Sequence, residues 1–215
     1  MENNTGARQR IILTAIDILN REGISGITTR RIAEQAGVNS AALNYYFGSR
    51  DNLIEQALTA TLEHAFSDWR MILENEDLNL PIRIFCFLDF TMEGIARYPG
   101  LVRSHLFDTN IPGNSRKLFE DRLAVIIDDL AVKLEGTDSQ SREELRISLS
   151  QTLMISIFAA ISPDLYRVIS GDHESESKRA DFLIGLLSRN LGIKLELTAR
   201  ARMSILKTLR EAFQE

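Results

Sequence analysis

The chain has 215 residues, a hydrophobic content of 44% and a formal net charge of −5. A chain of this length and apolar content can bury a substantial core as one or two domains. Its single cysteine, Cys86, excludes a disulfide framework within the chain and suits a reducing compartment.

Helical periodicity dominates the chain from its start, and no alternating pattern typical of strands is found. An apolar stripe from Ile11 to Leu19 predicts a first helix that ends at Gly23. Two short amphipathic helices follow between Thr28 and Leu53. They are joined by a turn at Ala36-Gly37-Val38, where glycine can adopt a positive φ cheaply.

The two short helices form a predicted helix-turn-helix. Asn39 or Ser40 can cap the second helix, and Leu43 and Phe47 face inward. The outward residues of this helix are small, polar or aromatic, as expected of a helix that enters a DNA major groove. They are Ser40, Ala41, Asn44, Tyr45 and Tyr46.

The rest of the chain continues the helical pattern. Helices are predicted from Asp51 to about Asn75, from Asn79 to a stop at Tyr98-Pro99-Gly100, over Leu101–Phe107, over Leu118–Leu134, from a capping box at Ser141 and Glu144 to Ile161, over Asp181–Leu191 and over Leu197–Phe213. We expect Pro163 to end the helix that reaches Ile161. We expect Gly171–Lys178 to form a polar connection. We predict an all-α protein with a three-helix head, residues 1–54, on a larger helical body, residues 55–215.

The charge is unevenly distributed between these parts. Residues 1–50 carry six arginines and four acidic residues, a net of +2, which leaves −7 for residues 51–215. A modestly basic head suits a DNA-binding protein that relies on specific contacts more than on bulk charge.

The polar start of the chain indicates no secretory signal, and the apolar run Leu153–Ile161 is far shorter than the ~20 residues that span a bilayer. We therefore expect a soluble, cytoplasmic protein.

The head resembles the amino-terminal domain of the TetR family of bacterial transcriptional regulators over roughly residues 8–54. The resemblance is carried in register by Arg10–Ile16, Leu19, Glu22-Gly23, Thr28-Thr29, Ile32-Ala33, Ala36-Gly37-Val38, Leu43, Tyr45, Phe47, Gly48-Ser49-Arg50 and Leu53. It implies a dimeric, ligand-responsive regulator, most simply a repressor, bound to a near-palindromic DNA operator.

The resemblance also implies which head residues contact DNA. Thr29 would contact a phosphate and Arg30 could reach a base. Ser40, Ala42 and Asn44 would lie over base edges, and Tyr45, Tyr46 and Arg50 would hold the backbone. Arg31 and Asn39 complete the predicted DNA-binding set. Two alternatives remain open from the residues alone: Arg30 and Arg31 could form a solvated helix face, and Tyr45 could belong to the core.

Three positions depart from the family pattern. Family members usually have glycine at Ala41 and tyrosine at Asn44, and lysine is commoner than arginine at Arg50. An amide at Asn44 can form a bidentate pair with adenine, so the operator sequence cannot be taken from relatives.

Candidate residues for an effector pocket lie in the predicted body. They are Phe85, Asp89, Met92, Glu93, Arg103, Phe107, Phe119, Met154 and Phe158. The aromatic residues could line a cavity or form plain core. Asp89 and Glu93 share a helix face and, with Arg103 or His105, could recognise a polar group, or they could simply be solvated. The expected effector is small and hydrophobic or amphipathic.

The late helices have broad apolar faces, and family members commonly pair through two late helices. The candidate dimer residues are Leu149, Leu153, Ile157, Leu183, Leu186 and Leu187, with internal core as the alternative or additional role.

No catalytic or metal-binding motif is found, so we predict neither an enzyme nor a bound cofactor or metal. The alternative function is a TetR-like architectural or division-control protein that binds many DNA sites and answers to a protein partner.

Overall fold

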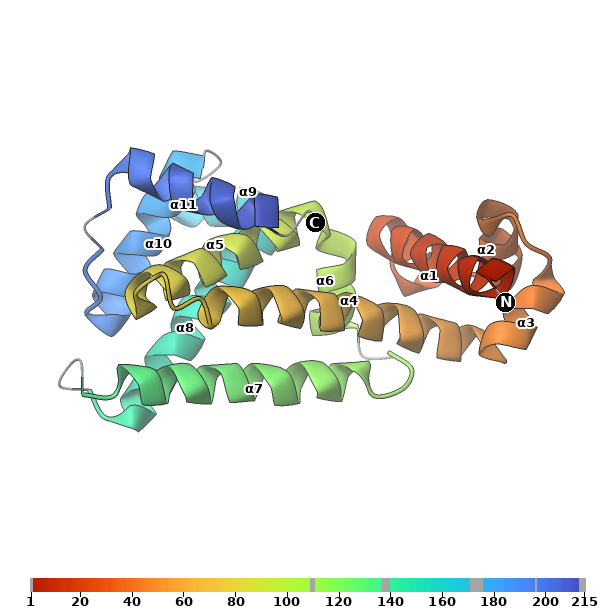
Figure 1. The fold of residues 1–215 in the computed structure, drawn as a ribbon, viewed down its shortest axis with the longest axis horizontal. Helices are drawn as coiled ribbons and strands as arrows, with labels where there is room; N and C mark the ends of the chain where they lie inside the picture. The colour runs from red at the N-terminus through yellow and green to blue at the C-terminus, as the bar shows by residue number, and fades with distance from the viewer. Residues whose placement is uncertain (1, 109–110, 137–139, 171–175, 196, 213–215) are drawn as a thin grey trace. The chain divides into compact units, whose positions relative to one another are not determined.

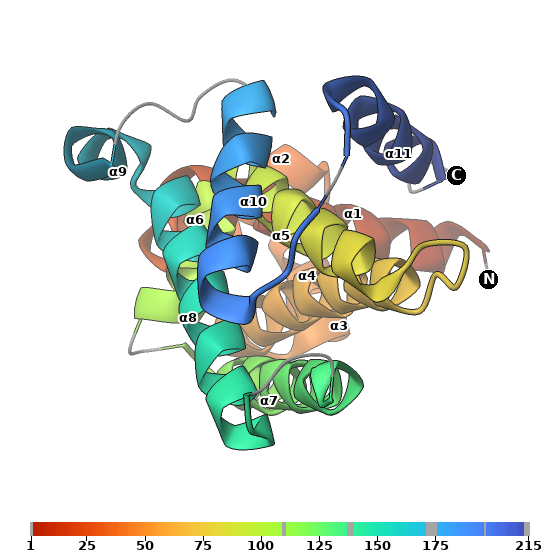
Figure 2. The ribbon, with the colours of Figure 1, turned by 90° about the vertical axis from the view of Figure 1, so that its left-hand side faces the viewer.

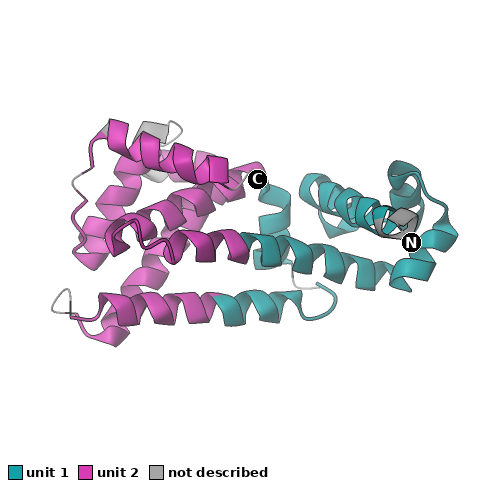
Figure 3. Ribbon diagram, viewed as in Figure 1, with its two compact units in different colours: residues 1–65, 98–122 teal, residues 66–97, 123–215 magenta. Residues whose placement is uncertain are grey.

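The computed structural model describes residues 2–108, 111–136, 140–170, 176–195 and 197–212. Over these ranges the chain is helical and contains no strand, which confirms the all-α prediction. The chain divides into two compact units, shown in separate colours in Figure 3. The first comprises residues 1–65 and 98–122, and the second residues 66–97 and 123–215.

The first unit contains the predicted head together with residues 55–65 and 98–122. Its elements, labelled in Figure 1, are α1 (Glu2–Glu22), a 3-10 turn (Ile24–Gly26), α2 (Thr29–Ala36), α3 (Ser40–Phe47), the first part of α4 (Arg50–Leu73), α6 (Pro99–Phe107) and the first part of α7 (Ser115–Leu134). Helix α1 packs against α2 and α6. Ile11, Leu19, Ile32 and Phe47 are buried in one continuous apolar core, as the periodicity predicts.

The second unit is a helical bundle. It holds the remainders of α4 and α7 with α5 (Leu80–Arg97), α8 (Arg142–Ile161), α9 (Pro163–Ser170), α10 (Glu176–Leu191) and α11 (Ala199–Ala212). Helix α8 packs against both α5 and α10, and α10 also packs against α5 (Figure 2). These three helices form the centre of the unit.

The predicted capping box at the start of α8 is present. Glu144 N–H donates to Ser141 Oγ at 3.3 Å, and Ser141 N–H donates to Glu144 Oε2 at 2.7 Å. These bonds, led by the one from the Ser141 backbone, lower the pKa of the Glu144 carboxyl. The sequence pattern thus located this helix start correctly, because a cap depends only on neighbouring residues.

Two details of the later helices differ from the prediction. Pro163 follows the end of α8 as expected, but it also begins a further helix, α9, which was not predicted. Proline is well tolerated as a first helical residue because its missing N–H would have no partner there. The predicted connection at Gly171–Lys178 is partly helical, since α10 begins at Glu176. Residues 171–175 of this connection lie outside the described ranges, as do residues 137–139, between α7 and α8, and Phe213 at the end of the last predicted helix.

Within the described ranges, one helix, α8, is long and apolar enough to cross a membrane by length and composition alone. Its mean hydropathy over 18 residues is 1.3, and 44% of that stretch is buried inside the chain. Since α8 packs between α5 and α10, it also has the properties of a core helix of the bundle.

Candidate nucleic-acid interface

The first helix of the motif, α2, ends at the glycine turn that its sequence predicts. The Thr28 hydroxyl caps its start by accepting from Arg31 N–H at 3.3 Å. Gly37 ends the helix with φ of 66°, a left-handed conformation that residues with a Cβ rarely adopt. Ile32, Ala33 and Ala36 are buried, so the opposite face of α2 is turned to solvent.

The second helix, α3, is capped by Asn39. Its side-chain oxygen accepts from Ala42 N–H at 2.8 Å, which decides between the two caps that the sequence left open. Leu43 and Phe47 are buried, and the helix ends at Gly48, whose N–H donates to Asn44 O at 2.9 Å. The burial of Leu43 and Phe47 determines which face of α3 points outward.

The outward face of α3 carries Ser40, Ala41, Asn44 and Tyr45, which are all exposed. The Tyr45 side chain is 76% exposed, so it is not part of the head's core. Tyr46 is half-buried and packs against that core, with its ring centroid 5.1 Å from that of Tyr45. Ala42 is also half-buried.

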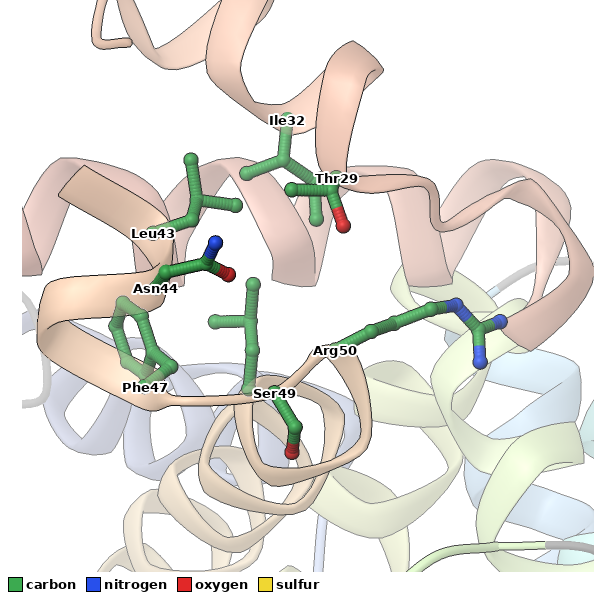
Figure 4. Close-up of a pocket in the computed structure, with 8 residues that line it drawn as sticks. Thr29, Ile32, Leu43, Asn44, Phe47, Ser49 and Arg50 are labelled. Carbon is green, nitrogen blue, oxygen red and sulfur yellow. The ribbon is translucent and has the colours of Figure 1, made fainter. Parts of the chain in front are cut away.

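Helices α2 and α3 meet at a small hollow beside this face. Figure 4 shows Thr29 and Ile32 of α2 facing Leu43, Asn44 and other side chains of α3 and early α4 across it. The arrangement brings Thr29 and Asn44, two predicted DNA-contacting residues, to the same part of the head.

Arg30 and Arg31 both pair with carboxylates within the head. Arg30, 89% exposed, lies with its Nε 2.9 Å from Glu34 Oε1. Arg31 donates two hydrogen bonds to Glu22, and these bonds lower the pKa of the Glu22 carboxyl. Exposed ion pairs contribute little free energy, so a DNA phosphate can compete for Arg30 in particular.

Arg50 is placed differently from the other predicted contacts. Its Nε donates to Ile27 O at 2.7 Å and its Nη2 donates to Ile24 O at 2.8 Å. The side chain therefore holds the segment that leads into α2, a role that no local sequence pattern indicates.

Comparisons with known proteins also indicate a DNA-binding regulator. Residues 11–57 match the model of the family described as bacterial regulatory proteins, tetR family. The tetracycline repressor class C of Escherichia coli is 32% identical over 90 residues, which cover 38% of this chain and 41% of that protein. The nucleoid occlusion factor SlmA of Aliivibrio fischeri is 30% identical over 156 residues, which cover 71% of this chain and 76% of SlmA. The chain belongs to the TetR family.

Solved structures of TetR-like proteins share the fold. A TetR-like transcriptional regulator from Rhodococcus sp. RHA1 has a TM-score of 0.67 at 16% identity, covering 87% of this chain and 97% of that one. AmtR of Mycobacterium smegmatis has a TM-score of 0.61 at 19% identity, covering 93% and 94%. The match to the tetracycline repressors is shorter, since it spans 41% of the class C and 33% of the class A protein.

The predicted effector-pocket residues divide between the two units. Arg103, Phe107 and Phe119 belong to the first unit, where Arg103 and Phe107 are exposed and Phe119 is half-buried. The other six belong to the second unit: Phe85, Asp89 and Met92 are buried, Glu93 is half-buried, and Met154 and Phe158 are exposed. A surface pocket of about 300 Å³ in the second unit is lined by other residues, among them Pro81, Ile82 and Leu197.

Asp89 and Glu93 are engaged within the second unit. Asp89 accepts from Arg179 Nε at 2.6 Å, and Glu93 accepts from Arg210 Nε at 2.9 Å. Arg97 also lies 3.2 Å from Glu93. The alternative of a solvated Asp89 is therefore wrong, because this carboxylate is buried in an ion-pair network that joins α5, α10 and α11.

His105 is buried in the first unit. Its Nε2 lies 3.3 Å from Thr61 Oγ1, and its ring stacks on Phe119 with centroids 6.3 Å apart. The Thr61 hydroxyl also donates to Leu58 O at 2.8 Å. Burial, followed by the charge of Arg116, lowers the pKa of His105 to about 4, so the ring is neutral near pH 7.

The predicted dimer residues all lie in the core of a single chain. Leu149, Leu153 and Ile157 of α8 and Leu183, Leu186 and Leu187 of α10 are buried without a partner chain. The exposed apolar residues of α8 are instead Ile147, Met154, Ile155 and Phe158. Their spacing places them on one face of the helix.

Proposed function

We propose that this chain is a dimeric transcriptional regulator, acting as a repressor, that binds double-stranded DNA through α3. The observation that carries the proposal is the exposed face of α3, with Asn44 and Tyr45, together with the exposed Arg30 of α2. A helix held rigidly by its buried side, with polar groups on its free side, is suited to the major groove. Membership of the TetR family supports the same conclusion.

The half-site that one α3 helix can contact is short, so affinity and register require two heads. In a two-fold dimer the recognition helices would enter successive major grooves about 34 Å apart on a near-palindromic operator. The exposed apolar face of α8, with Ile147, Ile155 and Phe158, is our candidate for the surface that pairs. An exposed apolar strip of this kind is costly in water and is covered on association.

The proposed regulation is release of the operator by a small hydrophobic or amphipathic effector that binds the helical body. Effector and operator would oppose each other through one coupling free energy, on the order of 1–3 kcal/mol. The apolar composition of the body helices, α5 and α8 above all, supports this class of effector. The regulator would act in the cytoplasm, associated with DNA.

An unbiased selection of DNA sequences by the purified full-length protein tests this function. We expect a near-palindromic sequence to be enriched and apolar or amphipathic compounds to release it. Enrichment of no sequence would contradict the DNA-binding function. Release by highly polar metabolites alone would contradict the effector class.

The alternative is a TetR-like architectural or division-control protein that binds many DNA sites and answers to a protein partner; one relative of this chain, SlmA, is named a nucleoid occlusion factor. Occupancy of many sites across the genome, without release by any small molecule, would favour it. A footprint at one promoter that a small molecule removes would favour the ligand-responsive repressor.

A further inference from the structure

Arg50 stands at the start of α4, directly after the helix-turn-helix, and all three of its guanidinium nitrogens are engaged within the head. Nε donates to Ile27 O at 2.7 Å, and Nη2 donates to Ile24 O at 2.8 Å. Nη1 donates to Asp51 Oδ1 at 3.2 Å. The side chain extends away from Asn44 in Figure 4.

The two carbonyl groups that Arg50 holds belong to the link between α1 and α2. Ile24 begins the 3-10 turn after Gly23, and Ile27 is the capping residue that follows it. The next residue, Thr28, is the cap of α2, and Thr29 and Arg30 follow at once. Arg50 thus joins the start of α4 to the peptide that sets where α2 begins.

We propose that Arg50 is a positioning residue of the DNA interface and not a phosphate contact. It fixes the start of α2, and with it Thr29 and Arg30, relative to α3 and α4. The inference deepens the proposed function and rests on it. Three of the five guanidinium N–H groups are already committed, two of them to carbonyls, so a phosphate would have to compete with these charge-assisted bonds and lie beside the Asp51 carboxylate.

Lysine cannot replace arginine in this arrangement. The guanidinium is a planar fork with several donors in fixed directions, whereas the ammonium of lysine is a compact charge on a flexible stem. Arg50→Lys therefore keeps the charge that a phosphate contact needs but loses the geometry that two carbonyl acceptors need. Arg50→Gln removes both.

The dependence of operator affinity on salt separates the two roles. Each phosphate contact contributes about 0.9 to the slope of log affinity against log salt concentration. For a positioning residue we expect Arg50→Lys and Arg50→Gln both to weaken operator binding about 10-fold, with the slope unchanged. Arg30→Lys and Arg30→Gln are the matched controls, since the Arg30 side chain is almost fully exposed. An Arg50→Lys protein that binds like the wild type, or an Arg50→Gln protein with a slope smaller by about 0.9, would overturn the inference.

A second measurement needs no DNA. Amide hydrogen exchange of the full-length protein should be faster over residues 24–32 in both Arg50 variants and unchanged there in the Arg30 variants. Unchanged exchange over this segment in the Arg50 variants would also overturn the inference. If the wild type selects no DNA but the Arg50 variants show faster exchange, the proposed function fails while Arg50 is still shown to hold the start of α2.

Discussion

The carboxylate of Asp89 lies 2.6 Å from Nε of Arg179, although the two residues are 90 positions apart in the chain. Asp89 is 1% exposed, and Arg210 approaches the same carboxylate to 3.7 Å. One buried acid on α5 therefore holds arginines of α10 and α11. A carboxylate so far from water is tolerated only while its charge is compensated.

We predict that Asp89→Ala lowers the free energy of unfolding by about 3–5 kcal/mol, because it leaves Arg179 without its buried partner. Urea denaturation followed by circular dichroism measures the change. Asp121→Ala is the control: Asp121 pairs with Lys117 on an exposed helix face, so its loss should cost at most about 1 kcal/mol. Equal effects of the two substitutions would show that the buried ion pair contributes no more to the free energy of unfolding than the exposed one.

The pair between Arg30 and Glu34 gives a prediction for DNA affinity. Arg30→Ala should weaken operator binding by about 1–3 kcal/mol while the protein stays folded, because a base or phosphate contact is lost. Glu34→Gln should strengthen binding, since it removes a carboxylate that competes with DNA for the same guanidinium. Fluorescence anisotropy with the selected operator measures both. If Arg30→Ala leaves the affinity for every sequence unchanged, Arg30 lies outside the interface.

Asn44 gives a prediction for sequence preference. Its amide can pair with adenine in a bidentate manner, so Asn44→Ala should cost about 1–3 kcal/mol and erase the preference at one symmetric pair of operator positions. Repeating the DNA selection with the variant locates the loss. A uniform drop across all sequences would instead indicate a phosphate contact, and an unaltered preference at every position would refute adenine recognition.

Substitutions at Phe158 and Leu186 should have different effects, the first on dimerisation and the second on folding. Phe158 is 41% exposed on α8, so Phe158→Glu should split the dimer and leave the protomer folded. Leu186 is buried in the same chain, so Leu186→Glu should unfold the protomer by burying an unpaired charge. Sedimentation and circular dichroism distinguish the outcomes. A wild-type protein that is monomeric at micromolar concentration would contradict the proposal that the two heads of a dimer bind one operator.

The burial of His105 predicts a dependence of stability on pH. An unfolded histidine binds a proton near pH 6.5, whereas the folded His105 stays neutral until about pH 4. Between these values the unfolded state binds more protons, so the free energy of unfolding falls as the pH is lowered. From pH 7 to pH 5 this group should contribute a loss of about 2 kcal/mol. His105→Gln should lack that contribution; an identical pH profile for variant and wild type would contradict it.

Much of the head could be predicted from the sequence because its determinants are local. The apolar spacing around Ile32 and Leu43, the glycine at Gly37 and the cap at Asn39 each act within a few residues. The same holds for the Ser141 capping box in the second unit. Such features predict where helices begin, end and turn their apolar faces, and the outward face of α3 follows from them.

The tertiary structure decided what covers each face and which charges meet. Leu186 of α10 and Phe158 of α8 both lie on helices with apolar faces, yet only the packing of α5, α8 and α10 decides that Leu186 is buried and Phe158 exposed. Arg179 reaches Asp89 and Arg50 reaches Ile27 across long separations in the chain, for which no periodic pattern gives a signal. Helical periodicity specifies the direction in which a side chain points from its own axis, whereas its partner is set by how separate helices pack together.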